Sequence, residues 1–192
     1  MKESRIAEIR ATTPTAEGEK HILTGRPIIY GTPTTINDPN GGSYTEIIER
    51  GALTGADLSD VHLFYNHDLN KVPLARTPKT MQLTVDEKGL IFIAELPDTA
   101  AAMEVYEAVK RGDLSGMSFA FKVPEGGDDY DVETNTRHIR SLAKVYECSI
   151  VPYPAYPTTS VEARNAQTAA KADYAARQKT KILVNQILLN VR

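Results

Sequence analysis

Short apolar stretches interrupted by turn residues dominate this 192-residue chain and restrict it to a fold made mostly of β-strands. The stretches are rich in β-branched and aromatic residues and are bounded by Gly, Pro, Asn and Asp, which is typical of strands. Many short strands with few helices predict a β-rich α+β domain. The predicted strands are residues 21–30, 61–65, 81–85, 89–96, 114–123, 137–142 and 144–151.

Two segments between these strands are predicted to be helical. Residues 43–51 begin with Ser43 and Glu46 at the spacing of a capping box, and Gly51 stands where a helix would end. The second helix begins after Asp98 or Thr99, keeps Ala102, Tyr106 and Val109 on one face, and ends before Gly112.

Length and composition favour one globular domain flanked by two arms. Residues 1–20 are polar and predict an arm or an edge strand, whereas residues 163–192 are rich in Ala and predict an amphipathic helical tail. Residues 166–192 carry five basic side chains and one acidic side chain, so the −3 net charge of the chain comes from an acidic body. An acidic body argues against nucleic-acid binding, because nucleic-acid sites are basic.

The sequence also argues against membrane insertion and metal chemistry. No apolar run approaches the roughly 18 residues that span a bilayer, and the amino end is charged and polar, so we expect the protein to stay in the cytosol. Cys148 is the single cysteine, which excludes an internal disulfide and a thiolate zinc site. We therefore expect no cofactor and no metal.

Common enzyme motifs are missing: there is no phosphate-binding Gly loop, no H-E-x-x-H and no G-x-S-x-G. The remaining candidates are polar residues at strand ends or within apolar strands, namely His67, Ser115, Ser118 and Glu147. Each alone is typical of a structural residue. Together, however, Ser, His and a carboxylate are the groups that convert a hydroxyl into a nucleophile.

Strand geometry favours Ser118 over Ser115, because they are three residues apart and point to opposite faces of one predicted strand. His67 follows the strand at 61–65, and the adjacent Asp68 is expected to shape the turn rather than orient the imidazole.

Glu147 lies within an apolar strand, where a carboxylate is costly to bury unless it is paired. Alternation places it on one face with Val145, Ser149 and Val151. If Glu147 is structural, its expected partner is an Arg such as Arg137 or Arg140.

Five segments resemble, in order and spacing, the prohead (capsid maturation) serine protease family of tailed bacteriophages, which is related in fold to herpesvirus assembly proteases. The resemblance covers residues 20–162. The segments are a Gly-x-Pro strand and turn, Glu-Ile-Ile-Glu-Arg-Gly-Ala-Leu at 46–53, Leu-Phe-Tyr-Asn-His-Asp at 63–68, Arg-Gly-Asp-Leu-Ser-Gly-Met-Ser-Phe-Ala-Phe at 111–121, and Glu-Cys-Ser-Ile-Val-Pro-Tyr-Pro-Ala-Tyr-Pro at 147–157.

This resemblance implies a small β-barrel-like core with peripheral helices, in which residues 21–162 form the protease domain. It implies that Ser118 is the nucleophile, that His67 is the general base and that Glu147 orients His67. Because a second His takes the third role in the herpesvirus relatives, His138 remains an alternative to Glu147. Oxyanion donors stay open between amides near residues 140–141 and amides beside Ser118.

The resemblance also implies what the protein acts on. The expected substrates are the scaffold or a scaffolding segment of the major capsid protein, and the chain itself, inside the immature procapsid in the host cytoplasm. Self-association is expected by analogy. The alternative is a non-catalytic capsid-assembly or scaffold component that keeps the protease fold. The basic tail is either a removable segment, which would carry the enzyme into the shell or pair with scaffold helices, or a helix packed on its own domain.

Overall fold

Three four-stranded sheets make up most of the computed structural model, which describes residues 8–11, 20–37, 42–152, 172–176 and 178–179. The first sheet is antiparallel throughout, with the strand order β1-β2-β8-β7. Its strands are β1 (Glu8–Ala11), β2 (His21–Ile29), β8 (Gly89–Leu96) and β7 (Met81–Asp86).

The other two sheets each contain one parallel pair. The second sheet has the order β10-β11-β4-β3, with β11 parallel to β4. The third has the order β6-β5-β12-β9, with β12 parallel to β5 and antiparallel to β9. Their strands are β10 (Asp128–Asp131), β11 (Thr136–Ile139), β4 (Ser43–Ile48), β3 (Thr34–Asn37), β6 (Ala75–Arg76), β5 (His62–Tyr65), β12 (Lys144–Val151) and β9 (Gly116–Lys122).

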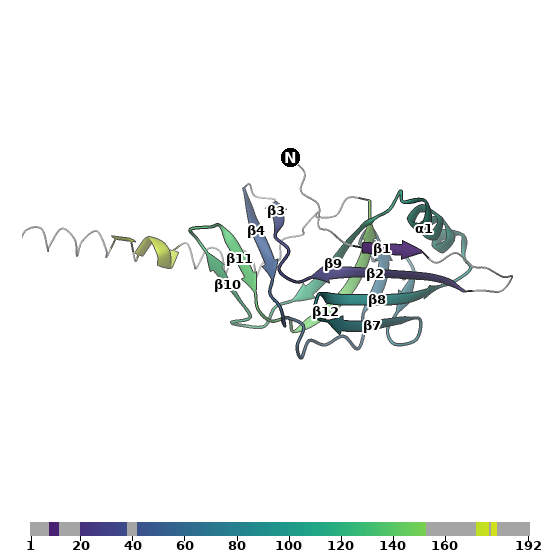
Figure 1. Ribbon diagram of the computed structural model, residues 1–192, viewed down its shortest axis with the longest axis horizontal. Helices are drawn as coiled ribbons and strands as arrows, with labels where there is room; N and C mark the ends of the chain where they lie inside the picture. Colours follow the sequence, from purple (N-terminus) through teal and green to yellow (C-terminus); the bar gives the residue numbers. More distant parts are fainter. Residues whose placement is uncertain (1–7, 12–19, 38–41, 153–171, 177, 180–192) are drawn as a thin grey trace, which may run out of the picture.

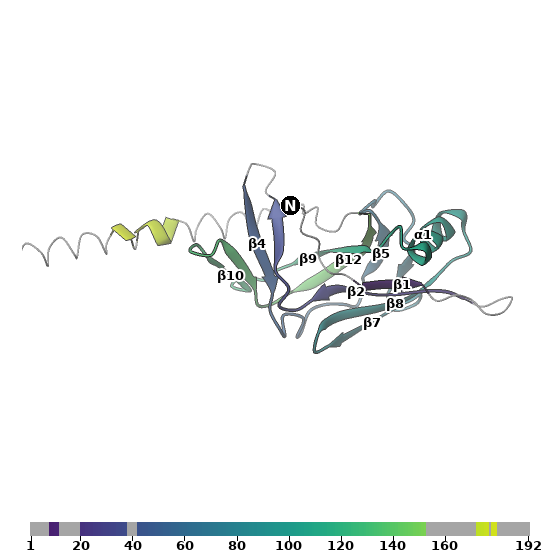
Figure 2. The same ribbon diagram turned by 45° about the horizontal axis from the view of Figure 1, so that its top comes forward.

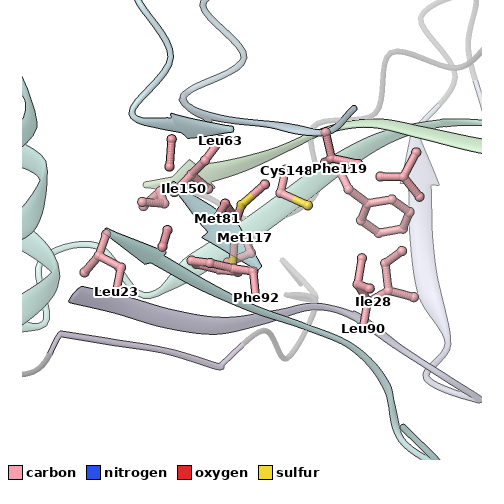
Figure 3. Packing of buried hydrophobic residues seen from close by; sticks show 14 of the residues in the cluster. Leu23, Ile28, Leu63, Met81, Leu90, Phe92, Met117, Phe119, Cys148 and Ile150 are labelled. Atoms are coloured by element: carbon pink, nitrogen blue, oxygen red, sulfur yellow. The ribbon is translucent and has the colours of Figure 1, made fainter. Parts of the chain in front are cut away.

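The hydrophobic core joins the first sheet to the third. Leu23 of β2 and Phe92 of β8 belong to the same buried cluster as Met117, Cys148 and Ile150 of the third sheet, and Figure 3 shows these side chains meeting between the ribbons. All five are fully or almost fully buried. Removing this apolar surface from water is the main stabilising contribution of the fold.

Helix α1 (Ala100–Arg111) confirms the second predicted helix. The Thr99 side chain accepts a hydrogen bond from the Ala102 amide at 3.4 Å, and Gly112 ends the helix with a φ of 83°. Its apolar face is buried against the core. In both views of the ribbon, α1 lies at the opposite end of the domain from the second sheet (Figures 1 and 2).

The predicted helix at 43–51 is wrong, because Ser43–Ile48 forms strand β4 between β3 and β11. Burial alternates along β4, which places Glu46 inside, where it contacts Arg137 across the parallel pair at 3.1 Å. The capping-box spacing was therefore coincidental, and Gly51 serves a turn with a φ of 86°. Strand β10 is not among the strands predicted from the sequence.

The β-rich α+β class agrees with the structure, but the barrel-like core does not. Within the described residues the strands form three separate sheets and none closes on itself. None of the helices in this part of the chain is long and apolar enough to cross a membrane. The apolar positions predicted for the tail helix, Val184, Ile187, Leu188 and Val191, lie outside the described residues; residues 172–176 and 178–179 are helical.

Candidate active site

A left-handed turn at the end of β5 positions His67. Asn66 and His67 both have positive φ angles, 55° and 57°, a region that side-chain-bearing residues adopt rarely. The Asn66 amide donates to the Ile150 carbonyl of β12 at 2.9 Å, which turns the chain toward that strand. Asp68 accepts a hydrogen bond from the Asn70 amide at 3.1 Å, so it shapes the turn, as the sequence predicts.

The imidazole of His67 contacts the carboxylate of Glu147, with 2.7 Å between Nδ1 and Oε1. The Glu147 side chain is 6% exposed, whereas that of His67 is 37% exposed. A carboxylate only accepts hydrogen bonds, so Nδ1 is the donor, and in the neutral form of the ring Nε2 then carries the lone pair. The arrangement can hold a neutral imidazole in one tautomer with a basic nitrogen at the protein surface.

Glu147 does not have the Arg partner that its structural interpretation assigned to it. Arg137 binds Glu46 and Asp128 instead, and Arg140 binds Asp129. Both arginines are therefore engaged in the second sheet.

Ser149, which the strand alternation puts on the same face as Glu147, also contacts the His67–Glu147 pair. Ser149 is fully buried, and its hydroxyl donates to Glu147 Oε2 at 2.5 Å. Ser149 Oγ also accepts a hydrogen bond from the His67 backbone N–H at 3.2 Å. The sequence pattern that indicates this contact is the i, i+2 spacing of Glu147 and Ser149. Residues two apart in a strand share a face, so the serine hydroxyl can reach the carboxylate.

Ser118 reaches this face of the sheet through the register of β9 and β12. Ser118 lies directly opposite Ser149 in the antiparallel ladder, and opposed residues put their side chains on the same face with Cα atoms about 4.5–5.5 Å apart. Ser118 is 6% exposed, whereas Ser115 precedes β9 and is exposed. The register thus puts Ser118 on the sheet face that carries Ser149 and Glu147, whereas Ser115 lies outside the strand.

No hydrogen bond joins the Ser118 hydroxyl to the His67 imidazole, although the structure describes both residues. Such bonds are often long in the absence of substrate and tighten when a substrate is bound. The chemistry available to the three side chains is general-base activation of a hydroxyl.

A β-bulge between Val145 and Glu147 corrects one part of the predicted alternation. Because the bulge inserts an extra residue, Val145 joins Cys148 in the core and Tyr146 becomes 44% exposed. Glu147 and Ser149 still share the face that carries the site.

The other candidates lie elsewhere. His138 Nδ1 donates a hydrogen bond to Glu49 Oε1 at 2.7 Å, and His138 belongs to β11 of the second sheet, not to the sheet that carries Glu147. The amides of Arg140 and Ser141, considered as oxyanion donors, both bond to the Gly127 carbonyl. Among the described side chains there is no group of three or more His, Cys, Asp or Glu that could hold a metal ion.

Comparison with known protein families gave one finding. The family model described as caudovirus prohead serine protease matches residues 7–173, a range that includes every residue of the site. Searches of curated proteins and of solved structures returned no match.

Proposed function

The chain belongs to the caudovirus prohead serine protease family, and from this premise we propose that it is a serine endopeptidase of procapsid maturation. Its proposed substrates are the scaffold, or a scaffolding segment of the major capsid protein, and the chain itself. The observation that supports this proposal is the 2.7 Å contact of His67 with the buried Glu147 on the same sheet face as Ser118. The proposed place of action is the interior of the immature shell.

In the proposed reaction, His67 Nε2 takes the Ser118 hydroxyl proton while Ser118 Oγ forms a bond to the scissile carbonyl carbon. The tetrahedral intermediate then collapses, the C–N bond breaks, and the proton on Nε2 passes to the leaving amine. Water attacks the acyl-enzyme ester, gives a proton to His67 and displaces Ser118, which recovers that proton.

Glu147 has two roles in this scheme. By accepting a hydrogen bond from Nδ1–H it holds the neutral imidazole in the tautomer whose Nε2 is unprotonated, and its negative charge stabilises the imidazolium that forms in the first step. Its burial strengthens this interaction, since a charge pair is weakly screened when water is excluded.

The proposal is tested by co-expressing the chain with the major capsid protein of the same phage and measuring intact masses. We expect wild-type protein and Ser115→Ala to cleave the capsid protein or the chain itself, and Ser118→Ala to leave both intact. Ser115→Ala is the matched control, because that serine is exposed and lies outside β9.

The competing function is a non-catalytic capsid-assembly component. Identical masses for wild-type and Ser118→Ala proteins, with folded chains and assembled shells, would favour it and reject the protease. A second assay needs no substrate: a fluorophosphonate probe should form an adduct at Ser118 in the wild-type protein, and His67→Ala should prevent that adduct.

A further inference from the structure

Ser149 contacts both members of the His67–Glu147 pair through one oxygen atom. Its hydroxyl donates to Glu147 Oε2 at 2.5 Å and accepts the backbone N–H of His67 at 3.2 Å. The residue is fully buried, so water does not compete for either bond. A buried donor and acceptor that satisfy each other in this way cost free energy when one partner is removed.

The bond to Glu147 fixes the carboxylate plane. The last torsion angle of a glutamate side chain has a broad distribution, so hydrogen bonds to both oxygens narrow the range of carboxylate orientations. In this site Ser149 holds Oε2 while His67 Nδ1 holds Oε1 at 2.7 Å. Removing the Ser149 hydroxyl leaves one oxygen of a nearly buried charge without its donor and frees the carboxylate to rotate.

The bond to His67 stabilises an unfavourable backbone conformation. Non-glycine residues in the left-handed region cost on the order of 1–2 kcal/mol each, and Asn66 and His67 are two in succession. Two hydrogen bonds to β12 oppose this cost. The backbone N–H of Asn66 donates to the Ile150 carbonyl, and the backbone N–H of His67 donates to the Ser149 hydroxyl. Only the second depends on a side chain.

We propose that Ser149 is a positioning residue that sets the orientation of both Glu147 and His67 for proton transfer with Ser118. The proposal rests on the proposed protease function for its kinetic part. Ser149 itself is not a catalytic residue, because a fully buried side chain does not touch the substrate.

The first test uses Ser149→Ala together with the matched pair Ser149→Thr and Ser149→Val. Thr and Val have nearly the same shape, so both bring the same extra bulk and only Thr keeps the hydroxyl. With a peptide that spans the mapped cleavage site, kcat should fall about 10- to 100-fold for Ala, the rate factor of one lost charge-assisted hydrogen bond. KM should stay the same within error, and Ser149→Thr should be faster than Ser149→Val by a similar factor.

The second test does not depend on cleavage. In Ser118→Ala protein with 15N-labelled histidine, the hydrogen on His67 Nδ1 should give a low-field NMR signal, assigned by its loss in His67→Gln. Adding Ser149→Ala or Ser149→Val should broaden or remove this signal, and adding Ser149→Thr should preserve it. Urea unfolding of each variant establishes that the domain is folded.

The outcomes separate the two proposals. Absence of cleavage by the wild-type chain, with the NMR signal still dependent on the hydroxyl, rejects the protease function and keeps the positioning role. Equal kcat for Thr and Val variants, or a His67 signal unchanged in folded Ser149→Ala, rejects the positioning role whatever the cleavage result.

Discussion

The buried ion pair between β4 and β11 gives the sharpest stability prediction. Arg137 is 3% exposed and binds Glu46, itself 5% exposed, at 3.1 Å and Asp128 at 2.5 Å. Arg137→Met keeps the aliphatic bulk but removes the guanidinium that binds the buried Glu46 carboxylate, and breaking a buried ion pair in this way costs about 3–5 kcal/mol. For a chain of this length each kcal/mol lowers Tm by about 2–4 °C, so we expect a decrease of roughly 6–20 °C.

The measurements are urea unfolding for the free energy and thermal unfolding for Tm, both followed by far-UV circular dichroism, in Ser118→Ala protein so that the proposed self-cleavage does not interfere. Arg140→Met is the control, because Arg140 also forms an ion pair in this part of the fold, with Asp129 of β10. The two side chains are 65% and 52% exposed, and an exposed pair contributes about 1 kcal/mol or less. Glu46→Met combined with Arg137→Met should be more stable than Arg137→Met alone, because no charge at position 46 is then left buried.

Equal losses for Arg137→Met and Arg140→Met would refute this reasoning. In the helix that the sequence pattern predicts for residues 43–51, Glu46 would be an exposed cap residue, and loss of Arg137 would leave no buried charge. The comparison therefore tests strand β4 itself as well as the strength of the ion pair.

Three further predictions concern the site and its surroundings. Glu147→Gln should lower kcat by about 10²- to 10⁴-fold in the peptide cleavage assay through loss of the tautomer control, whereas His138→Ala should leave kcat unchanged because His138 binds Glu49 in another sheet. Hydrogen bonds from Lys144 and Ser59 hold the pKa of Asp57 well below its usual range. The ionised Asp57 therefore stabilises the folded state above pH 4, and this contribution declines as the pH falls below the unfolded-state pKa of about 3.9. Asp57→Asn should reduce the difference between the urea midpoints at pH 7 and pH 3. Burial, with the Glu147 charge adding to it, raises the pKa of the Cys148 thiol, so a thiol reagent should modify it only in urea, as mass spectrometry would show.

Local signals predicted helix α1 and strands β7 and β8 well. The α1 boundaries follow from Thr99 and Gly112, whose capping roles depend on nearby atoms alone. The turn at His67 was also predictable, because an apolar strand followed by Asn-His-Asp ends at the first of these residues. In each case the residues that decide the structure are neighbours in the sequence.

The errors arose where distant residues decide the structure. Ser43 and Glu46 satisfy a capping rule, yet pairing with β3 and β11 and the Arg137 contact favour a strand. Similarly, the bulge that exposes Tyr146 depends on the register with β9. The role of Ser149 was missed for the same reason, since its bond to the His67 backbone spans 82 positions of sequence.

Strand β12 is the element on which the candidate site depends. Its register with β5 sets the turn at Asn66 and His67, and its register with β9 places Ser118 opposite Ser149. The face of β12 that carries Cys148 and Ile150 is fully buried, and a slip of one residue would exchange this face for the polar one. Burial of the apolar face therefore fixes the register that brings Ser118, His67 and Glu147 together, so core packing and the geometry of the site are determined by the same alternation in residues 147–150.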